Sequence, residues 1–351
     1  MRVGFLGAGL IATFHSKMIR RSGLDRGGTV VRAGVYDPDP QRLDAFAAAS
    51  GHVACGSEDE VLDGCDAIYV CTWTSEHPRL VRAAAARGLA VFCEKPLATT
   101  LADAEAMAAD LATAGVTNQV GLILRRSPAY LWARHLIADE RAGRVMGVVF
   151  RDDQFIPVQG HYASTWRGDV TRAGAGTLLE HSIHDVDMLH ALVGPVTAVS
   201  ARRANFHAIA GIEDVVSLSL EFAGGAVGTL SSIWHDNLAR PSLRRVEVFC
   251  ERRYVHLDGD DWFGPVSWTD ADGTQGTLEG DALVSAAADL IDGPLNPDEA
   301  FLRAALEHRA AWPDAEVAVA AHRVVDAAYR SADAGGAAVE IGSGGPSAGA
   351  I

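Results

Sequence analysis

The sequence predicts an α/β protein with two domains: a doubly wound parallel sheet first, then an α+β domain with a large, mostly antiparallel open sheet. Three observations support this fold class. Apolar strands alternate with helical segments up to about residue 122, which is typical of a parallel sheet. After about residue 195, strand-like stretches follow one another with few helices between them, which favours antiparallel pairing. The length of 351 residues favours two domains over one.

The first domain is expected to contain five strands separated by helices. The strands are expected at residues 2–6, 29–36, 66–71, 88–93 and 116–122. The helices are expected at residues 13–19, 41–50, 58–62 and 101–114, with another running from about residue 78 to residue 86. Because each strand is followed by a helix, the strands can run parallel with helices on both faces of the sheet.

The second domain is expected to begin with a helix and to continue mainly as strands. The strand-like stretches are residues 145–156, 198–205, 215–222, 226–234, 245–250, 254–257 and 264–268. The helices are expected at residues 130–139, 176–192, 297–308 and 314–332. We therefore place the first domain at residues 1–122, the second at 123–340 and a flexible tail at 341–351.

The composition argues against a nucleic-acid or membrane partner. The formal net charge is -15, and a chain this acidic repels phosphate backbones and anionic membrane surfaces. The five cysteines form no CxxC pair and no metal-binding spacing, so we expect reduced thiols and no metal site. The chain starts directly with a strand, and no apolar run approaches the length of a membrane span. We therefore expect a cytoplasmic protein.

A glycine-rich turn joins the first strand to the first helix. The residues after the strand read G-x-G-x-x-A and lead directly into a helical segment, which is the context that a dinucleotide fingerprint requires. The first glycine allows a tight turn, and the second lets the backbone approach a pyrophosphate at the positive end of the helix. The residues expected to contact the cofactor here are Gly7, Gly9, Leu10 and Ile11.

The second strand ends in Asp37, where a carboxylate would accept hydrogen bonds from the adenosine ribose hydroxyls. A carboxylate at this place would repel a 2′-phosphate, so we expect NAD, with NADP less favoured. The alternative is a plain Asp-Pro turn, since Pro38 follows. The interval from Gly9 is longer than usual, and a loop at residues 22–28 can absorb the excess.

Polar residues also follow the next two strands. Thr72 comes directly after the strand at 66–71, and Glu94, Lys95 and Pro96 come directly after the strand at 88–93. Ligands of open parallel sheets bind at the carboxyl ends of the strands, so Lys95 is a candidate for proton chemistry. The alternative is a surface Glu-Lys turn, because exposed charges are the norm.

A second group of candidate residues lies in the helix expected at 176–192. Glu180 and His184 are four residues apart and would share one face, with apolar residues on the opposite side. A carboxylate beside an imidazole orients it and suits it to act as a base near neutral pH. Three alternatives remain open: a solvated charged face, a metal site formed by Glu180, His181 and His184, and a core histidine bonded to the backbone. Trp166 and Arg167, just before this helix, would either stack on a planar ring or serve only for packing.

Together these motifs resemble the glucose–fructose oxidoreductase / inositol dehydrogenase (Gfo/Idh/MocA) family. The resemblance covers residues 1 to about 340 and rests most on the E-K-P tripeptide together with the distant His-x-x-Asp helix. It implies an N-terminal Rossmann domain and NAD(P)-dependent oxidation or reduction of a secondary alcohol on a sugar, an inositol or a related compound. It also implies a homodimer or homotetramer, because family members commonly pair their open sheets.

The resemblance assigns roles to individual residues. It implies that Lys95 is the catalytic lysine, that His184 transfers the proton, and that Glu180 occupies the third catalytic position. Near the cofactor it implies the residues Thr72, Trp73, His77, Glu94, Lys95, Trp166 and Arg167. Three departures are present: Glu180 replaces the usual Asp, Trp73 replaces the usual Pro, and the triple-glycine run reads Gly-Ala-Gly.

The substrate is left open at this point. Residues that would line its pocket are Lys95, Arg126, Glu180, His181, His184 and His235. Three other functions within the family compete with a sugar or inositol dehydrogenase. They are an NAD-dependent glycosidase, a nucleotide-sugar ketoreductase, and a non-catalytic ligand-sensing homologue. The presence of both Lys95 and His184 argues against the last.

Overall fold

A computed structural model describes residues 1–160 and 162–342 of the chain. The chain divides into two compact units. The first contains Met1–Leu122 and Asn296–Val319, and the second contains Ile123–Leu295 and the residues from Ala320 onward. Residues 296–319 were expected in the second domain, and here the sequence-based boundary is wrong. Of the expected tail, residues 343–351 lie outside the described part of the chain, and Ile341 still donates a backbone hydrogen bond to Thr197.

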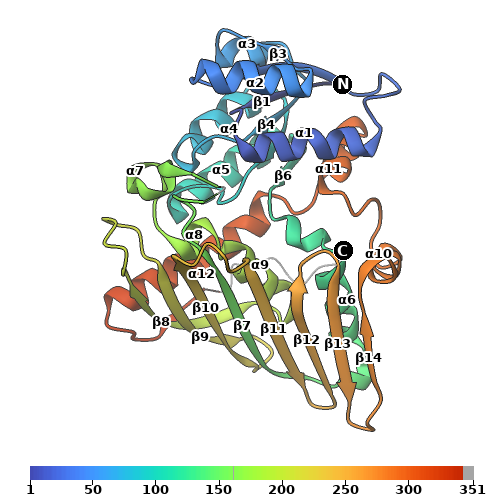
Figure 1. Cartoon of the computed structure of the whole chain (residues 1–351), viewed down its shortest axis with the longest axis vertical. Helices are drawn as coiled ribbons and strands as arrows, with labels where there is room; N and C mark the ends of the chain where they lie inside the picture. Colours follow the sequence, from blue (N-terminus) through green and yellow to red (C-terminus); the bar gives the residue numbers. More distant parts are fainter. Residues whose placement is uncertain (161, 343–351) are drawn as a thin grey trace. The chain divides into compact units, whose positions relative to one another are not determined.

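The first unit is a doubly wound parallel sheet, as predicted. Its six strands lie in the order β3-β2-β1-β4-β5-β6, and every pair is parallel (Figure 1). The strands are β1 Arg2–Leu6, β2 Val31–Tyr36, β3 Val53–Ala54, β4 Ala67–Val70, β5 Ala90–Cys93 and β6 Asn118–Val120. The helices are α1 Leu10–Ser22, α2 Pro40–Ser50, α3 Glu58–Asp63, α4 His77–Ala85, α5 Leu101–Ala114 and α11 Pro297–Leu306.

A stack of aromatic rings explains why α11 belongs to the first unit. Phe5, Tyr69 and Phe92 lie side by side on β1, β4 and β5, with ring centroids 4.8 Å apart and nearly parallel planes. Phe301 of α11 meets both Tyr69 and Phe92 edge-on, at 5.5 and 5.6 Å. All four rings are fully buried. Aromatic pairs in these geometries stabilise a core beyond simple area burial, so the C-terminal segment completes this core.

The second unit is a nine-stranded open sheet in the order β14-β13-β12-β11-β7-β10-β9-β8-β15. Within this sheet, only β7 and β10 pair in parallel among the described strands, so the prediction of a mostly antiparallel sheet is confirmed. The strands are β7 Val145–Phe155, β8 Val196–Ala204, β9 Val215–Phe222, β10 Val227–His235, β11 Leu243–Cys250, β12 Arg253–Asp260, β13 Gly264–Asp270, β14 Gln275–Leu278 and β15 Val339–Glu340.

Helices cover one face of this sheet. The longer ones are α6 Pro128–Ala138, α9 Ile183–Leu192, α10 Gly280–Ala288 and α12 Ala315–Asp333, and the short ones are α7 Val170–Ala173 and α8 Thr177–Glu180. Alternate residues of the strands pack under the helices, such as Val148 and Phe150 of β7. The residues between them point to the opposite face, where Val149 and Val227 are exposed. No helix among residues 1–160 and 162–342 is long and apolar enough to cross a bilayer.

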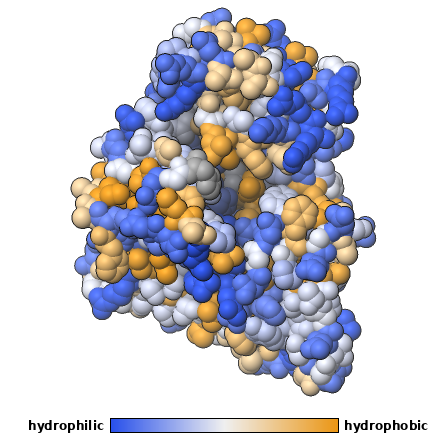
Figure 2. All heavy atoms as spheres, viewed as in Figure 1, coloured by the Kyte–Doolittle hydropathy of each residue, from blue (hydrophilic) through white to orange (hydrophobic). Residues whose placement is uncertain are grey.

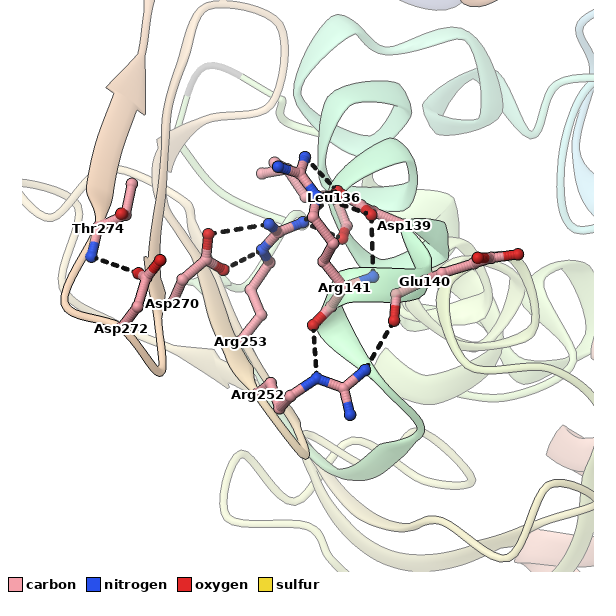
Figure 3. Close-up of polar contacts among 9 residues, drawn as sticks. All are labelled: Leu136, Asp139, Glu140, Arg141, Arg252, Arg253, Asp270, Asp272 and Thr274. Atoms are coloured by element: carbon pink, nitrogen blue, oxygen red, sulfur yellow. Dashed lines mark hydrogen bonds and ion pairs between the residues drawn. The ribbon is translucent and has the colours of Figure 1, made fainter.

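A buried arginine ties α6 to the sheet (Figure 3). Arg253 of β12 donates from Nη1 to the carbonyl of Leu136, near the C-terminal end of α6, at 2.9 Å. Its guanidinium also pairs with Asp270 of β13 and with Asp139, just past α6. A cation at the C-terminus of a helix satisfies open carbonyls and the negative end of the helix dipole. Arg253 therefore fixes the end of α6 to β12 and β13.

Candidate active site

The glycine turn has the local geometry that a dinucleotide phosphate needs. Gly7 has a φ of +93°, and a Cβ there would lie 2.5 Å from the carbonyl oxygen of Cys71, so only glycine fits. A Cβ on Gly9 would meet nothing within 4 Å, which leaves open space in front of the backbone. Gly9 caps α1 without a side-chain hydrogen bond to its first turn. The backbone N–H groups at this helix end are therefore available to an anion.

The start of α1 is also open to a ligand. Leu10 is 62% exposed and Ile11 is 36% exposed. Figure 2 shows orange, hydrophobic surface at this end of the helix. These two adjacent aliphatic side chains form an apolar surface beside the glycine turn, which fits a bound dinucleotide.

Asp37 lies beside the glycine turn. Its Oδ2 accepts a hydrogen bond from the backbone N–H of Ala8 at 2.8 Å, and its Oδ1 accepts one from Asp39 at 2.9 Å. The carboxylate thus forms the Asp-Pro turn and is also held against the glycine turn. The Asp-Pro turn is therefore present, and its carboxylate lies beside the glycine turn; a contact between Asp37 and the adenosine ribose stays a prediction.

The lysine turn follows directly at the carboxyl end of β5. Lys95 is half-buried, and its neighbour Pro96 accepts a hydrogen bond from Nδ1–H of buried His77 at 3.0 Å. Thr72 and Trp73 follow β4, which pairs with β5 through Val70 and Cys93. Thr72, Trp73 and Lys95 therefore lie at one edge of the sheet, where open parallel sheets bind ligands. His77 holds the turn that carries Lys95.

Beneath this turn lies a buried group of charges, here called the histidine cluster: His15, Glu94 and Asp298. Of these, only Glu94 was predicted from the sequence, as a residue near the cofactor. His15 Nε2 is 2.9 Å from Glu94 Oε1, and Nδ1 is 2.8 Å from Asp298 Oδ1. Burial alone would lower the pKa of His15, but the two carboxylates outweigh it and raise that pKa to about 10. Burial opposes ionisation of Glu94, yet His15 and Lys95 hold its pKa below the usual value.

In the second unit, the helix expected at 176–192 is broken. α8 ends at Glu180 and α9 begins at Ile183, so Glu180 and His184 do not share one face of a continuous helix. The break has a tertiary cause. Ser182 Oγ donates to Ser232 Oγ of β10 at 2.6 Å, and His181 Nε2 contacts Asp152 Oδ2 of β7 at 2.8 Å. Contacts with two strands therefore replace the helical conformation at residues 181 and 182.

Glu180, Arg167 and Trp166 come together as one group. Arg167 Nε donates to Glu180 Oε2 at 3.1 Å, and the Arg167 guanidinium lies 4.4 Å from the centre of the Trp166 ring. The Glu180 side chain is fully buried. Glu180 is therefore paired with a cation from the segment that precedes its helix, as a buried carboxylate requires.

The second glycine of the Gly-Ala-Gly run is needed to start α8. A Cβ on Gly176 would lie only 1.8 Å from the carbonyl oxygen of Glu213. The N-cap residue of α8, Gly176, has no side chain to cap the helix, and the Glu213 carboxylate instead accepts hydrogen bonds from the backbone N–H groups of Gly176 and Leu178, at 2.8 and 3.1 Å. Tyr329 donates to the same carboxylate at 2.8 Å. Gly176 and Glu213 thus position Glu180.

A second buried set of charges, here called the arginine cluster, surrounds His181. Its members are His181, Arg244, Asp152, Asp185 and Asp261. Arg244 contacts the three carboxylates at 2.7 to 3.1 Å. Burial, followed by the neighbouring Asp152, raises the pKa of Asp185 to about 7 despite Arg244. Burial likewise raises the pKa of Asp152. The cluster holds three acids beside one permanent cation.

The remaining predicted residues are distributed over this unit. His184 lies in the first turn of α9 and is buried. Arg125 holds this helix in place through a two-pronged ion pair with Asp187, from Nε and Nη2 at 2.9 and 2.7 Å. Arg126 donates from Nη1 to the carbonyl of Pro294 at 2.7 Å, so it is partly engaged in holding the backbone.

His235 does not join His181. His235 lies 3.6 Å from Asp153, whereas His181 contacts Asp152. Successive side chains of a strand point to opposite faces of the sheet, so the two histidines contact opposite faces of β7. The structure therefore separates two residues that were expected to line one substrate pocket. Asp153 pairs closely with Arg240, which places His235 in a different group of charges.

Comparison with known proteins agrees with both units. The model of the "Oxidoreductase family, NAD-binding Rossmann fold" matches residues 1–122, and the "GFO/IDH/MocA C-terminal domain" matches residues 130–256. The chain therefore belongs to the Gfo/Idh/MocA oxidoreductase family, and its first unit is the NAD-binding Rossmann fold of that family.

Two curated relatives are dehydrogenases or reductases. The chain is 32% identical to the 1,5-anhydro-D-fructose reductase of Ensifer adhaerens over 234 residues, which are 64% of this chain and 67% of the relative. It is 32% identical to the inositol 2-dehydrogenase of Rhizobium meliloti over 244 residues, 66% and 68% of the two chains. A levoglucosan dehydrogenase solved with NADH has the same fold, with a TM-score of 0.86, 20% identity and coverage of 97% and 99%. The chain is accordingly an NAD-dependent oxidoreductase.

Proposed function

We propose that the protein transfers a hydride between NAD and a secondary alcohol or ketone carbon of a sugar, an inositol or a similar polyol. The two curated relatives support this class of substrate, because both act on polyhydroxylated rings by their names. Asp37, held against the glycine turn, supports NAD over NADP, since a fixed carboxylate there would repel a 2′-phosphate. The position of Lys95 supports the proposal most: it lies at the carboxyl edge of β5, the ligand-binding edge of this fold.

The proposed chemistry divides between Lys95 and His184. NAD, when bound, supplies the hydride chemistry, and the protein provides orientation and proton transfer. Lys95 donates a hydrogen bond from Nζ to the substrate oxygen and stabilises the negative charge that develops there. A ring nitrogen of His184 accepts the hydroxyl proton during oxidation and returns it during reduction. Buried Glu180, paired with the partly exposed Arg167, orients the segment that leads to His184.

Replacement of Lys95 or His184 tests these roles. We expect Lys95→Ala and His184→Ala each to lower turnover by about 10²–10⁴-fold, the usual contribution of proton transfer, with NAD still bound. Turnover would be read from nicotinamide absorbance with a panel of polyols, inositols and sugars, and NAD binding from nicotinamide fluorescence. The chain has one other lysine, Lys17 on α1, and Lys17→Ala is the matched control. Wild-type turnover in either active-site variant would contradict the assignment.

The same panel with NAD and with NADP tests the cofactor preference. We expect NAD to be favoured, and Asp37→Ser to raise the relative activity with NADP because it removes the carboxylate. Equal use of both cofactors by the unaltered protein would contradict the role of Asp37.

We also infer a homo-oligomer that pairs the open face of the second sheet. Val227 is 60% exposed there, and Val149 and Phe249 are also exposed. Apolar side chains gathered on an open sheet face indicate an interface. Light scattering after size exclusion tests this, and a monomer at micromolar concentration would contradict it.

The cysteines are buried free thiols, which fits a reducing cytoplasm.

A further inference from the structure

The histidine cluster links three parts of the first unit that are distant in sequence. His15 comes from α1, Glu94 follows β5, and Asp298 lies in the first turn of α11. His15 and Asp298 are 283 residues apart, and both side chains are fully buried. Buried charges are costly unless paired, so a cluster retained at the base of the lysine turn requires an explanation.

The geometry fixes the protonation of His15. Both ring nitrogens lie within hydrogen-bond distance of a carboxylate oxygen, and an ionised carboxylate can only accept. His15 therefore donates from both nitrogens and is an imidazolium. The centre of the His15 ring lies 4.8 Å from that of Phe92 and 5.5 Å from that of Tyr69, so two aromatic rings pack beside the imidazole. The raised pKa of His15, about 10, agrees with this charge at neutral pH.

The Glu94 carboxylate connects His15 to the backbone of Lys95. While Oε1 accepts from His15, Oε2 accepts from the backbone N–H of Lys95 at 3.2 Å. A Cβ on Gly121 would lie 2.4 Å from Glu94 Oε1, so the neighbouring strand end leaves room for this carboxylate only because it is glycine. The carboxylate is thus confined between His15, Gly121 and the Lys95 backbone.

We propose that Asp298 and His15 are positioning residues that act through Glu94 to hold the Lys95 backbone in its working place. The proposal rests on the proposed function, since it assigns a partner to Lys95 in that reaction. Asp298 fixes the His15 ring, His15 fixes Glu94, and Glu94 fixes the turn. The C-terminal segment of the chain therefore contributes to the lysine turn through α11.

A double-mutant cycle tests whether Asp298 acts through Glu94. We expect Asp298→Asn and Glu94→Gln each to lower kcat by about 10- to 100-fold, by analogy with the loss of an outer carboxylate partner of a metal-binding histidine, with KM for NAD nearly unchanged. If Asp298 acts through Glu94, the double variant should be no slower than the slower single variant by more than about threefold. A double variant whose loss equals the product of the two single losses would overturn the proposal.

Glu299→Gln is the matched control. Glu299 is the next residue on α11, and its carboxylate pairs with Arg303 instead of the cluster. We expect the kcat of Glu299→Gln to match that of the unaltered enzyme.

The failure of this proposal and the failure of the proposed function give different results. If Lys95→Ala retains full turnover, the proposed function fails. If Lys95→Ala is inactive but Asp298→Asn is fully active, only the positioning role of Asp298 fails.

Lysine NMR supplies a readout other than activity. The chain contains only two lysines, Lys17 and Lys95, so the full-length protein with ¹³C-labelled lysine gives two side-chain Cε signals, assigned through Lys17→Arg. We expect Asp298→Asn to shift the Lys95 signal and to leave the Lys17 signal in place, whereas Glu299→Gln should shift neither. An unchanged Lys95 signal in Asp298→Asn would overturn the proposal.

Histidine NMR of the unaltered protein tests the proposal even if variants of the histidine cluster do not fold. In the unaltered protein with ¹⁵N-labelled histidine at pH 8, His15 should carry a proton on both ring nitrogens, visible as one-bond couplings at each. The signal is assigned by its absence in His15→Gln, or by its contacts to Phe92 if that variant does not fold. A neutral His15 at this pH would overturn the proposal.

Discussion

The two units each bury a cluster of opposite charges, but the cation differs between them. In the histidine cluster the cation is His15, which can lose its charge, and two carboxylates share it. In the arginine cluster the cation is Arg244, which cannot lose its charge at any ordinary pH, and three carboxylates surround it. In the first cluster the base holds the extra proton, whereas in the second an acid, Asp185, takes one up.

This difference determines whether the stability of each unit depends on pH mainly above or mainly below neutral pH. A cation whose pKa is raised in the folded protein stabilises the fold until the pH approaches that pKa. An acid whose pKa is raised in the folded protein also loses its contribution as the pH rises, because its charged form is the costly one, but this loss begins at the lower, ordinary pKa of an acid. The first unit should therefore lose stability on the alkaline side, while the second loses part of its stability already as the pH rises toward neutral.

The largest effect is expected when the permanent cation is removed. Arg244→Met leaves the carboxylates of Asp152, Asp185 and Asp261 without their shared partner, and an uncompensated buried charge costs about 3–5 kcal/mol. The free energy of unfolding should fall by that amount in urea titrations at pH 7, followed by circular dichroism. Arg245→Met is the control, because Arg245 lies half-exposed on the opposite face, where substitutions usually change stability by no more than about 0.5 kcal/mol. Equal losses in both variants would show that the cluster is not what Arg244 stabilises.

A smaller effect, and one that depends on pH, is expected for the titratable cation. The pKa of His15 rises from 6.5 to about 10 on folding, so its stabilisation is complete below about pH 6.5 and disappears as the pH rises to about 10. We expect His15→Gln to cost about 2–3 kcal/mol at pH 6 and progressively less toward pH 10.

His52→Gln is the control for the pH dependence expected of His15→Gln. His52 is also buried in the first unit, but burial and then the nearby Arg32 lower its pKa to about 4, so it stays neutral from pH 6 to 10. The stability difference between His52→Gln and the unaltered protein should therefore stay constant from about pH 8 to pH 10, where His52 is neutral in both the folded and the unfolded state. A constant difference for His15→Gln as well would refute the charged state of His15.

Local patterns predicted most of the fold and one half of the candidate site. The glycine turn, Asp37 and Lys95 each follow a strand directly, so their positions depend on a few neighbouring residues and on the edge of a parallel sheet. The strand alternation of the second unit is visible for the same reason, since period-2 burial is a local property.

Features that depend on distant partners were missed. The spacing of Glu180 and His184 suits one helix, but bonds from residues 181 and 182 to β7 and β10 interrupt it. The helix at 297–306 has an apolar face that would suit either unit, and only the fit of Phe301 on Tyr69 and Phe92 decides between them. The sequence does indicate that His15 is buried. It lies on the apolar face of α1, three residues after buried Ala12 and four before buried Ile19. A histidine at such a position indicates a buried partner, but the sequence does not show which.

The smallest effect concerns the protonated acid of the arginine cluster. The pKa of Asp185 is about 7 in the folded protein against 3.8 ordinarily, so its contribution to stability is full below about pH 3.8 and is lost as the pH rises to about 7. The Asp185→Asn variant has no ionisable group at this position, so its free energy of unfolding does not fall in this way. Relative to the unaltered protein, its free energy of unfolding should therefore improve by about 1–2 kcal/mol between pH 4 and pH 8. Asp258→Asn, on the exposed face of β12, should show no such trend. A relative stability of Asp185→Asn that falls with pH would mean that Arg244 keeps Asp185 ionised, and the two clusters would then not differ in which group holds the proton.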